Sequence, residues 1–395
     1  MRKKLTQSHR LLAGKRRDRK GHLAPLRPPD PLERSDPPVP TKSGRAGLCE
    51  ILLFISIAFA AQTCDQAIVP ISNPRGPKWV IYTRSNSPLV SDTINAIFVD
   101  FENTKWIATS SGANSYNAGR WQKFTDSLRY TTPFGRSWEV NAITVGADKS
   151  VWFGLAGGGI VKLNLFSSAG TRWKRYRAPV INSDFVYSLT TDNLGNIYVG
   201  TSSGVSRHIP NPTDPDAGLW YKYTSGNSPI PDEPIRSAGV NPYDNLLWFG
   251  TYSHGVVSFD GDLNWNVDTP SEQPFPIISL AFSIGSTIWF GTYADWAYRY
   301  SITTSEWTHI ADSASGGGLQ GNFVNAVAVD RDGNVWFGTN KGLTQFNGSS
   351  YMTLTSSNAP LPSDTIKALS VDFNNNLWIG TVNGLAEYNE EGTVP

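Results

Sequence analysis

The chain has 395 residues, of which 34 are Lys or Arg and 33 are Asp or Glu, so its formal net charge is +1. Charged residues make up 17% and aromatic residues 12%, which argues against intrinsic disorder and coiled coil for most of the chain. The two cysteines, Cys49 and Cys64, exclude a disulfide scaffold and a CxxC zinc or redox site. The 36 Gly, 26 Pro and 14 Trp favour many short strands joined by tight turns.

The N-terminal region differs from the rest in charge. Residues 1–47 contain 13 Lys or Arg and four acidic residues, a net charge of +9, so they are predicted to be a disordered basic leader. Residues 48–61 include the apolar run ILLFISIAFAA, which is too short to span a bilayer comfortably and matches a secretory signal peptide. Ala58 and Ala60 supply an A-x-A cleavage site. A short uncleaved signal anchor is the alternative.

Cys64 follows this run, at a position where bacterial lipoproteins carry a lipidated cysteine, although residues 61–63 match the usual small-residue box poorly. The other interpretation is an ordinary free cysteine within a linker at residues 62–77. We expect an exported protein that is periplasmic, on the cell surface or secreted, and that contacts a membrane only if Cys64 is lipidated. No later stretch approaches the length of a transmembrane helix.

A short phrase related to W-F-G-T recurs seven times after the leader. Its copies lie 41 to 50 residues apart, a period typical of four-stranded propeller blades and too long for leucine-rich or tetratricopeptide units. The copies stand at residues 106–109, 152–155, 198–201, 248–251, 289–292, 336–339 and 378–381. The sequence therefore predicts an all-β fold, a seven-bladed β-propeller with four-stranded blades over residues 78–390, followed by a tail at 391–395.

Each unit begins with an alternating strand, such as INAIFVD at residues 94–100, and a turn rich in Asp, Asn and Gly. The W-F-G-T strand follows; its aromatic ring is expected between neighbouring sheets, and its Gly allows another backbone to come close. A third strand and a fourth strand that usually begins with Trp complete the unit. One fourth-strand phrase, WVIY at 79–82, precedes the first unit and none follows the last, so the N-terminal strand is predicted to join the last blade and close the ring.

The last two units carry the most regular copies, DRDGNVWFGTNKGL at 330–343 and VDFNNNLWIGTVNGL at 371–385. They resemble the two-component regulator propeller repeat, which builds the extracytoplasmic sensor of many bacterial hybrid histidine kinases and also occurs in secreted stand-alone proteins. The resemblance covers about residues 79–389 and implies a non-catalytic propeller that binds a ligand or a partner. We expect no kinase, receiver or immunoglobulin-like module in this chain, and therefore no direct signalling by it.

The candidate site is predicted on one face of the ring. Turns between second and third strands share that face with the connections from one blade to the next, and by fold analogy it is the usual ligand face. Of the 14 Trp, only two lack a repeat position, and both fall in or beside these connections. The predicted ligand-binding residues, whose rings and polar groups suit a sugar or another polar ligand, are Trp296, Tyr293, Asp295, Tyr252, His254, Trp138, Arg136 and Phe134. The alternative is that these rings only pack over the blades.

Patterns for catalysis or metal binding are sparse. His208, His254 and His309 do not repeat and have no metal-spaced partner, so no catalytic residue, metal site or cofactor is predicted. Residues 330–334 resemble a calcium loop only superficially and are interpreted as hairpin-turn chemistry. An enzyme similar to streptogramin lyases, which have similar repeat phrases, is the catalytic alternative.

Two functions therefore stay open: a sensor-like module for a carbohydrate-type or peptide ligand, and a structural scaffold for a protein partner. Cleavage after Ala60 would leave 21 Lys or Arg and 28 Asp or Glu, a net charge of −7. Because nucleic acid is a polyanion, it is not expected as a partner of so acidic a protein.

Overall fold

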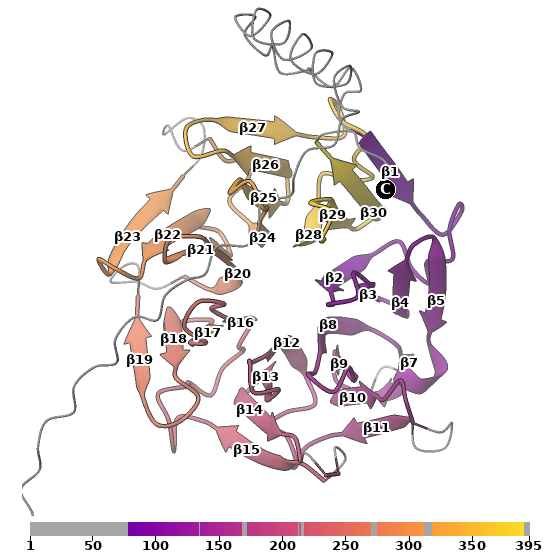
Figure 1. The fold of residues 1–395 in the computed structure, drawn as a ribbon, viewed down its shortest axis with the longest axis vertical. Helices are drawn as coiled ribbons and strands as arrows, with labels where there is room; N and C mark the ends of the chain where they lie inside the picture. The colour runs from indigo at the N-terminus through magenta and orange to yellow at the C-terminus, as the bar shows by residue number, and fades with distance from the viewer. Residues whose placement is uncertain are drawn as a thin grey trace, which may run out of the picture. The chain divides into compact units, whose positions relative to one another are not determined.

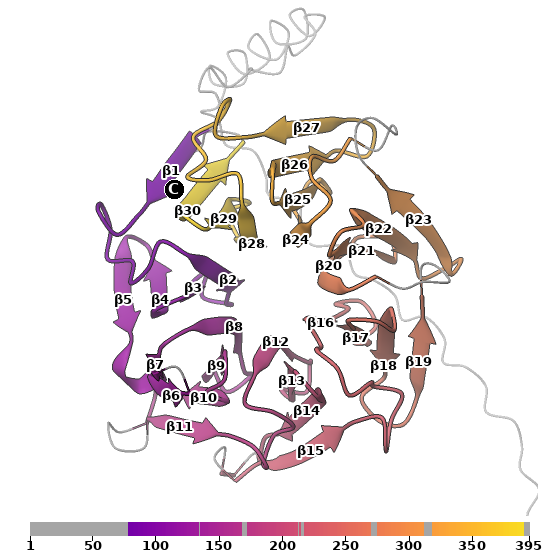
Figure 2. The same ribbon diagram turned by 180° about the vertical axis from the view of Figure 1, so that it is seen from behind.

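The computed structural model describes residues 78–133, 135–167, 172–211, 213–214, 217–269, 275–311 and 318–390. They belong to one compact unit, Ser72–Pro395. Seven four-stranded sheets follow one another around a central opening (Figures 1 and 2), which confirms the predicted seven-bladed β-propeller. The leader, signal region, linker and tail predicted for residues 1–77 and 391–395 lie outside the described residues.

Blades 1 to 6 are consecutive in the sequence, and each runs from an inner first strand to an outer fourth strand. Blade 1 consists of β2 (Ile94–Val99), β3 (Lys105–Thr109), β4 (Gly112–Asn117) and β5 (Arg120–Phe124). Blade 2 consists of β8 (Val140–Val145), β9 (Val151–Leu155), β10 (Ile160–Leu163) and β11 (Trp173–Tyr176). Blade 3 consists of β12 (Val186–Thr191), β13 (Ile197–Thr201), β14 (Gly204–Ile209) and β15 (Leu219–Tyr223). Blades 4 to 6 consist of β16 (Ser237–Val240), β17 (Leu247–Gly250), β18 (Val256–Phe259), β19 (Trp265–Asp268); β20 (Ile277–Ser283), β21 (Thr287–Thr292), β22 (Ala297–Ser301), β23 (Glu306–Ile310); and β24 (Val324–Val329), β25 (Val335–Thr339), β26 (Gly342–Phe346), β27 (Tyr351–Leu354). Between blades 1 and 2 lie the short helix η1 (Asp126–Leu128) and the hairpin β6 (Tyr130–Thr132) and β7 (Gly135–Ser137).

Blade 7 combines both ends of the described chain. It contains β28 (Ile366–Val371), β29 (Leu377–Thr381), β30 (Gly384–Asn389) and the N-terminal strand β1 (Lys78–Tyr82). β1 is the outermost strand and pairs antiparallel with β30, with Trp79 opposite Tyr388. The prediction that the N-terminal strand closes the ring is therefore confirmed.

The W-F-G-T strands form the second strand of each blade and are buried between neighbouring sheets. Trp106 of blade 1 contacts Phe153 of blade 2 with 6.3 Å between ring centroids, and Trp336 of blade 6 meets Tyr388 of blade 7 at 5.5 Å. The repeated glycine allows this packing: a Cβ atom on Gly338 would lie 2.5 Å from Cγ2 of Ile366 in the next blade, and one on Gly200 would lie 2.6 Å from the backbone carbonyl oxygen of Ile235. Both expectations for this strand, aromatic filling and close backbone approach, therefore hold.

The acidic turn between first and second strands of a blade also holds its neighbouring tryptophan. The Asp330 carboxylate accepts hydrogen bonds from the backbone N–H groups of Asp332 and Asn334 at 3.0 and 2.8 Å. Its other oxygen accepts from Asn334 Nδ2 at 2.9 Å and from Trp336 Nε1 at 2.8 Å. These contacts agree with hairpin-turn chemistry, since the carboxylate is occupied by its own turn.

Candidate ligand-binding site

The first strand of most blades contains an irregularity next to the central opening. In β2, Ile94 pairs with Thr109 and Ala96 with Ala108, so Asn95 has no partner in β3. The same register shift follows the first residue of β8, β12, β20, β24 and β28. Such a β-bulge bends the strand and redirects the additional side chain. The first strand expected from the sequence is present, and its alternation is interrupted at this position.

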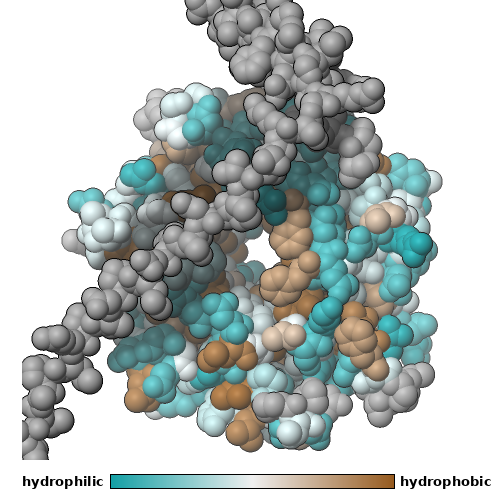
Figure 3. All heavy atoms as spheres, in the orientation of Figure 1, coloured by the Kyte–Doolittle hydropathy of each residue, from teal (hydrophilic) through white to brown (hydrophobic). Residues whose placement is uncertain are grey.

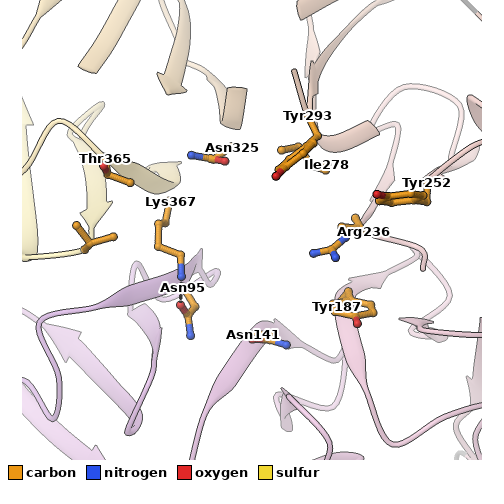
Figure 4. Close-up of a pocket in the computed structure, with 11 residues that line it drawn as sticks. Asn95, Asn141, Tyr187, Arg236, Tyr252, Ile278, Tyr293, Asn325, Thr365 and Lys367 are labelled. Atoms are coloured by element: carbon orange, nitrogen blue, oxygen red, sulfur yellow. Dashed lines mark hydrogen bonds between the residues drawn. The ribbon is translucent and has the colours of Figure 1, made fainter. Parts of the chain in front are cut away.

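The six bulge residues and their counterpart in blade 4, which directly precedes β16, line one cavity of about 660 Å³ (Figure 4). Four further lining residues come from turns on the same face of the ring or from the residue that precedes β28. The bulge-position residues, one per blade, are Asn95, Asn141, Tyr187, Arg236, Ile278, Asn325 and Lys367, and the further residues are Tyr252, Tyr293, Thr365 and Val382. Every blade contributes a side chain, so this cavity requires the closed ring.

The channel wall changes character below the cavity. The residues that follow the bulge positions are small and then aliphatic, as in Ala96 and Ile97 of blade 1 and Ala368 and Leu369 of blade 7. Polar groups for a ligand are therefore concentrated at the mouth of the channel.

Side chains of the first strands also connect neighbouring blades. Asn95 Nδ2 donates to the carbonyl oxygen of Val140 at 2.9 Å, which joins blade 1 to blade 2. In five other pairs of neighbouring blades, a side chain likewise donates a hydrogen bond to a backbone carbonyl oxygen at the start of the next blade. These bonds are Asn141 to Val186 (2.9 Å), Ser188 to Ile235 (2.9 Å), Ser237 to Ile277 (3.4 Å), Ser279 to Val324 (3.2 Å) and Asn325 to Ile366 (2.8 Å). Lys367 Nζ completes the circle by donating to Asn95 Oδ1 at 2.5 Å. The cavity walls are thus held by the contacts that hold the ring.

Arg236 is the exposed cation of the cavity. Its guanidinium carbon lies 4.6 Å from the ring centroid of Tyr187, a cation–π contact between blades 4 and 3. Within the described part of the chain, the guanidinium makes no ion pair and no hydrogen bond through its nitrogen atoms. Figure 4 shows it directed toward the middle of the cavity, near Tyr252.

Lys367 is the second cation and is half-buried on the opposite side of the cavity (Figure 4). Burial lowers its pKa below the ordinary lysine value, and the Glu139 carboxylate offsets only part of that effect. The carboxylate of Glu139 is not among the lining groups. The lysine therefore contributes positive charge to a cavity without an acidic lining residue.

Of the predicted site residues, Tyr252 and Tyr293 line the cavity. Tyr252 lies in the turn between β17 and β18 and is 45% exposed. Tyr293 directly follows β21, is 51% exposed, and packs edge-on against Phe323 with 4.6 Å between ring centroids. Both rings thus have one accessible side at the mouth of the channel.

Trp296 and Asp295 follow Tyr293 in the same turn but do not line the cavity. Trp296 has a φ of 52°, in the left-handed region where most other blades have Gly at the equivalent position of the turn. Its ring centroid lies 6.1 Å from that of His309 in the outer strand β23. Asp295 accepts a hydrogen bond from the Tyr298 hydroxyl and lies 3.4 Å from His309 Nε2. Trp296 and Asp295 therefore contact the outer strand of blade 5 and not the central cavity. We call this outer part of the face the rim.

His254 also lies on this face, outside the cavity lining. Its Nδ1 atom is 3.1 Å from Oε1 of Glu233, which belongs to the connection that precedes β16. Ser253 donates from its backbone N–H to the same carboxylate, at 2.8 Å. His254 is therefore part of a small polar cluster between two connections.

The remaining predicted residues lie between blades 1 and 2. Arg136 is an exposed residue of β7, and Trp138, which is partly buried, forms an isolated backbone bridge with Ser111. Neither lines the cavity. Phe134 lies outside the described residues.

The sequence prediction missed Asn95, Asn141, Arg236, Asn325 and Lys367, which the cavity brings together. A signal was present, because Asn95, Asn141, Asn325 and Lys367 each follow the first buried residue of their unit's first strand. Arg236 likewise follows a buried residue, Ile235, directly before β16. Their identities differ from blade to blade, so they do not stand out as a repeated phrase. A comparison of the units by column, rather than by motif, would have identified them.

Other chemistry is limited in the residues that the structure describes. No group of three or more His, Cys, Asp or Glu side chains there is arranged to hold a metal ion. The described residues also include no helix with the length and apolar character needed to cross a membrane. A second cavity of about 490 Å³ lies between the turns of blades 6 and 7 and includes Asp332 and Asn375, which hydrogen-bond to each other at 2.7 Å.

Comparison with known proteins identifies the repeat. The family model for the two-component regulator propeller matches residues 318–341 and 360–383. The chain therefore carries two-component regulator propeller repeats, and the resemblance expected from the sequence is confirmed.

Similar proteins include a histidine kinase, a sensor domain and a lyase, and the two solved structures share the propeller fold. Histidine kinase P4 of Formosa agariphila is 24% identical over 216 residues, which cover 52% of this chain and 12% of the kinase. The extracellular domain of a putative hybrid two-component system from B. thetaiotaomicron superposes with a TM-score of 0.60 at 17% identity, over 80% of this chain and 42% of that domain. Virginiamycin B lyase from Staphylococcus aureus superposes with a TM-score of 0.61 at 15% identity, over 79% and 99% of the two chains. This chain thus spans less than half of the sensor relatives, and the structural similarities establish the fold alone.

Proposed function

We propose that this protein is an exported, sensor-type propeller that binds a small carbohydrate-type or peptide ligand at the mouth of its central channel. The observation that carries the proposal is the cavity of about 660 Å³ to which all seven blades contribute. Its volume falls within the range of about 300 to 1,000 Å³ that is usual for small-molecule sites. Tyr252 and Tyr293 offer accessible ring faces, and the surrounding amides and cations offer directional polar contacts.

Export is supported by the predicted signal segment at residues 48–61 and by the extracellular location of the similar sensor domain. The periplasm, the cell surface and the medium are all compatible with this proposal, and lipidation of Cys64 would select a membrane-anchored form. Mass spectrometry of the N-terminus of the mature protein, purified from membrane and soluble fractions, distinguishes these locations. A mature protein that retains residues 1–47 would contradict the proposed export route.

The ligand proposal is tested with the full exported chain on arrays of glycans and of short peptides, followed by titration calorimetry of the best hit. Tyr252→Ala and Tyr293→Ala should each weaken binding by about tenfold, which corresponds to losing about 1.4 kcal/mol. His254→Ala is the matched control, because its side chain is on the same face but outside the cavity lining. Unchanged affinity in both tyrosine variants would overturn the assignment of the cavity.

A scaffold function is the second candidate and is supported by the opposite face of the propeller. The turns between first and second strands expose apolar side chains there, such as Phe101 at 87% and Ile284 at 76% exposure. Similar residues at these turns are Leu194, Tyr243 and Phe373, and turns between third and fourth strands add Phe166 and Leu263. Brown, hydrophobic residues lie beside the central opening on this face in Figure 3. Exposed apolar groups of this kind mark protein-binding surfaces.

Crosslinking in the native host distinguishes the scaffold from the ligand-binding function. A protein captured by the wild type and lost in a Phe101→Ser/Ile284→Ser variant would favour the scaffold. Glycan or peptide binding without such a partner would favour the ligand site. The enzyme alternative is tested by an assay for lactone opening with added Mg²⁺, in which we expect no turnover; turnover would contradict a pure binding role.

A further inference from the structure

We infer that the ligand of the central cavity is an acidic carbohydrate, whose carboxylate or sulfate groups are bound by Arg236 and Lys367. This inference rests on the proposed function, because it assigns a ligand class to the same cavity. Three observations support it: the positive charge of the cavity lining, the hydrogen-bond donors and acceptors there that have no partner among the described residues, and the directions of the hydrogen bonds that the lining side chains make.

The cavity lining is positively charged although the chain as a whole is not. The eleven lining residues include Arg236 and Lys367 and no Asp or Glu. The full chain has a net charge of only +1, and its blades are acidic once the basic leader is set aside. Two cations on nearly opposite sides of one concave site favour an anion there, because low-dielectric walls concentrate their field.

Arg236 is available for a ligand. Its guanidinium carbon lies 4.6 Å from the ring centroid of Tyr187, a contact that leaves its N–H donors without a partner among the described residues. A planar fork of N–H donors matches the two oxygens of a carboxylate or sulfate. The positioned but unpaired guanidinium therefore suits recognition of an oxyanion.

Lys367 lacks a counter-ion within the cavity. Its Nζ atom donates to the neutral amide oxygen of Asn95, and no carboxylate lies within ion-pair distance of it among the described residues. Glu139 is the acidic group that acts on it at longer range. Burial that disfavours the charged ammonium would be offset by a bound anion, so binding and the charge of Lys367 support each other.

The amides of the ring indicate the rest of the ligand. Asn141 and Asn325 use their Nδ2 atoms to hold the carbonyl oxygens of Val186 and Ile366. Their Oδ1 atoms make no hydrogen bond with another described residue, so these oxygens can accept hydrogen bonds from ligand hydroxyl groups. Donors for an oxyanion, acceptors for hydroxyls and the rings of Tyr252 and Tyr293 together match an acidic sugar.

The test uses the full exported chain and a glycan array in which uronate-containing and sulfated oligosaccharides are each paired with a neutral oligosaccharide of the same linkage. Titration calorimetry then measures the best hit against the wild type, Arg236→Gln, Lys367→Gln and the control Arg136→Gln. Arg136 is an exposed arginine that does not line the cavity. Thermal unfolding of each variant verifies that it is folded.

We expect acidic members of the array to bind, with their neutral counterparts at least about tenfold weaker, and the comparison of uronates with sulfates shows which oxyanion is preferred. Arg236→Gln should weaken binding by about tenfold or more, as should Lys367→Gln, and Arg136→Gln should leave it unchanged. Affinity should also fall as salt is added.

Two results overturn the inference while the proposed function stands. The first is that neutral glycans or peptides bind as tightly as acidic glycans and that their binding depends on Tyr252. The second is that the folded Arg236→Gln and Lys367→Gln variants both keep full affinity. Failure of every glycan and every peptide to bind the folded wild type overturns the proposed function and this inference together. The two failures are thus distinguishable.

Discussion

Replacing Asp372 with Asn should strongly destabilise the propeller, because this residue forms a buried ion pair where the ring closes. Asp372 lies in the first turn of blade 7, and Lys105 lies in the second strand of blade 1. Their Oδ2 and Nζ atoms are 2.9 Å apart, and the side chains are 0% and 6% exposed. Asp372 also accepts hydrogen bonds from Trp378 Nε1 at 3.1 Å and from the backbone of Asn376 at 2.9 Å.

The expected magnitude follows from the burial of the pair. Removing one partner leaves Lys105 as an uncompensated buried charge, which costs about 3 to 5 kcal/mol of unfolding free energy. Burial acts to raise the pKa of Asp372, but hydrogen bonds from Lys105 and Trp378 outweigh it, so the pKa is lowered overall. The stabilisation is therefore present above the unfolded-state pKa of about 3.9 and is lost as pH falls through the lower folded-state value.

Urea unfolding followed by tryptophan fluorescence, at pH 7 and in a series down to pH 3, measures both effects. Glu102→Gln is the control, because Glu102 pairs with Lys149 between blades 1 and 2 while both side chains are 62% and 58% exposed. That variant should unfold like the wild type. An Asp372→Asn variant that loses less than about 1 kcal/mol, or keeps the full acid dependence of the wild type, would show that the buried ion pair does not stabilise the ring.

Three further predictions concern the ring and its cavity. Gly338→Ala places a Cβ atom 2.5 Å from Ile366 and should lower the free energy of unfolding in urea by about 1 to 3 kcal/mol. The control Gly226→Ala, whose nearest atom is 3.8 Å away, should be neutral. Equal urea midpoints for the two variants would contradict the packing argument. Asn141→Ala removes the donor to the Val186 carbonyl and should cost about 1 to 3 kcal/mol, so an unchanged stability would show that the bond between blades is dispensable. Because burial lowers the pKa of Lys367, the unfolded chain binds this proton more tightly, so stability rises with pH between the lowered folded-state pKa and the ordinary lysine pKa. Lys367→Met should remove that part of the slope of unfolding free energy against pH, and an identical slope in both proteins would contradict the prediction.

The blades could be predicted from sequence because their main determinants are local and repeated. The W-F-G-T aromatic residues fill the space between sheets, and Gly338 permits the approach of Ile366, so the chemistry needed in every blade recurs in every unit. Closure by β1 could be predicted for a related reason: WVIY has the pattern of a fourth strand and stands where no blade precedes it.

The lining of the central cavity could be predicted only in part. The face and two of its residues, Tyr252 and Tyr293, followed from the order of strands and from their place in the turns. The bulge in each first strand could not be seen, because INAIFV reads as ordinary alternation, whereas its register shift brings Asn95 to the cavity. Trp296 was predicted to bind ligand because it replaces a glycine of the turn, but in the structure its ring lies beside His309 at the rim.

The most direct test of the central claim is a crystal structure of the protein with the tightest ligand from the glycan and peptide arrays. We expect ligand density at the mouth of the central channel, in contact with Arg236 and with Tyr252 or Tyr293. Density at the rim beside His254, or on the opposite face near Phe101, with the central cavity free of ligand, would contradict it.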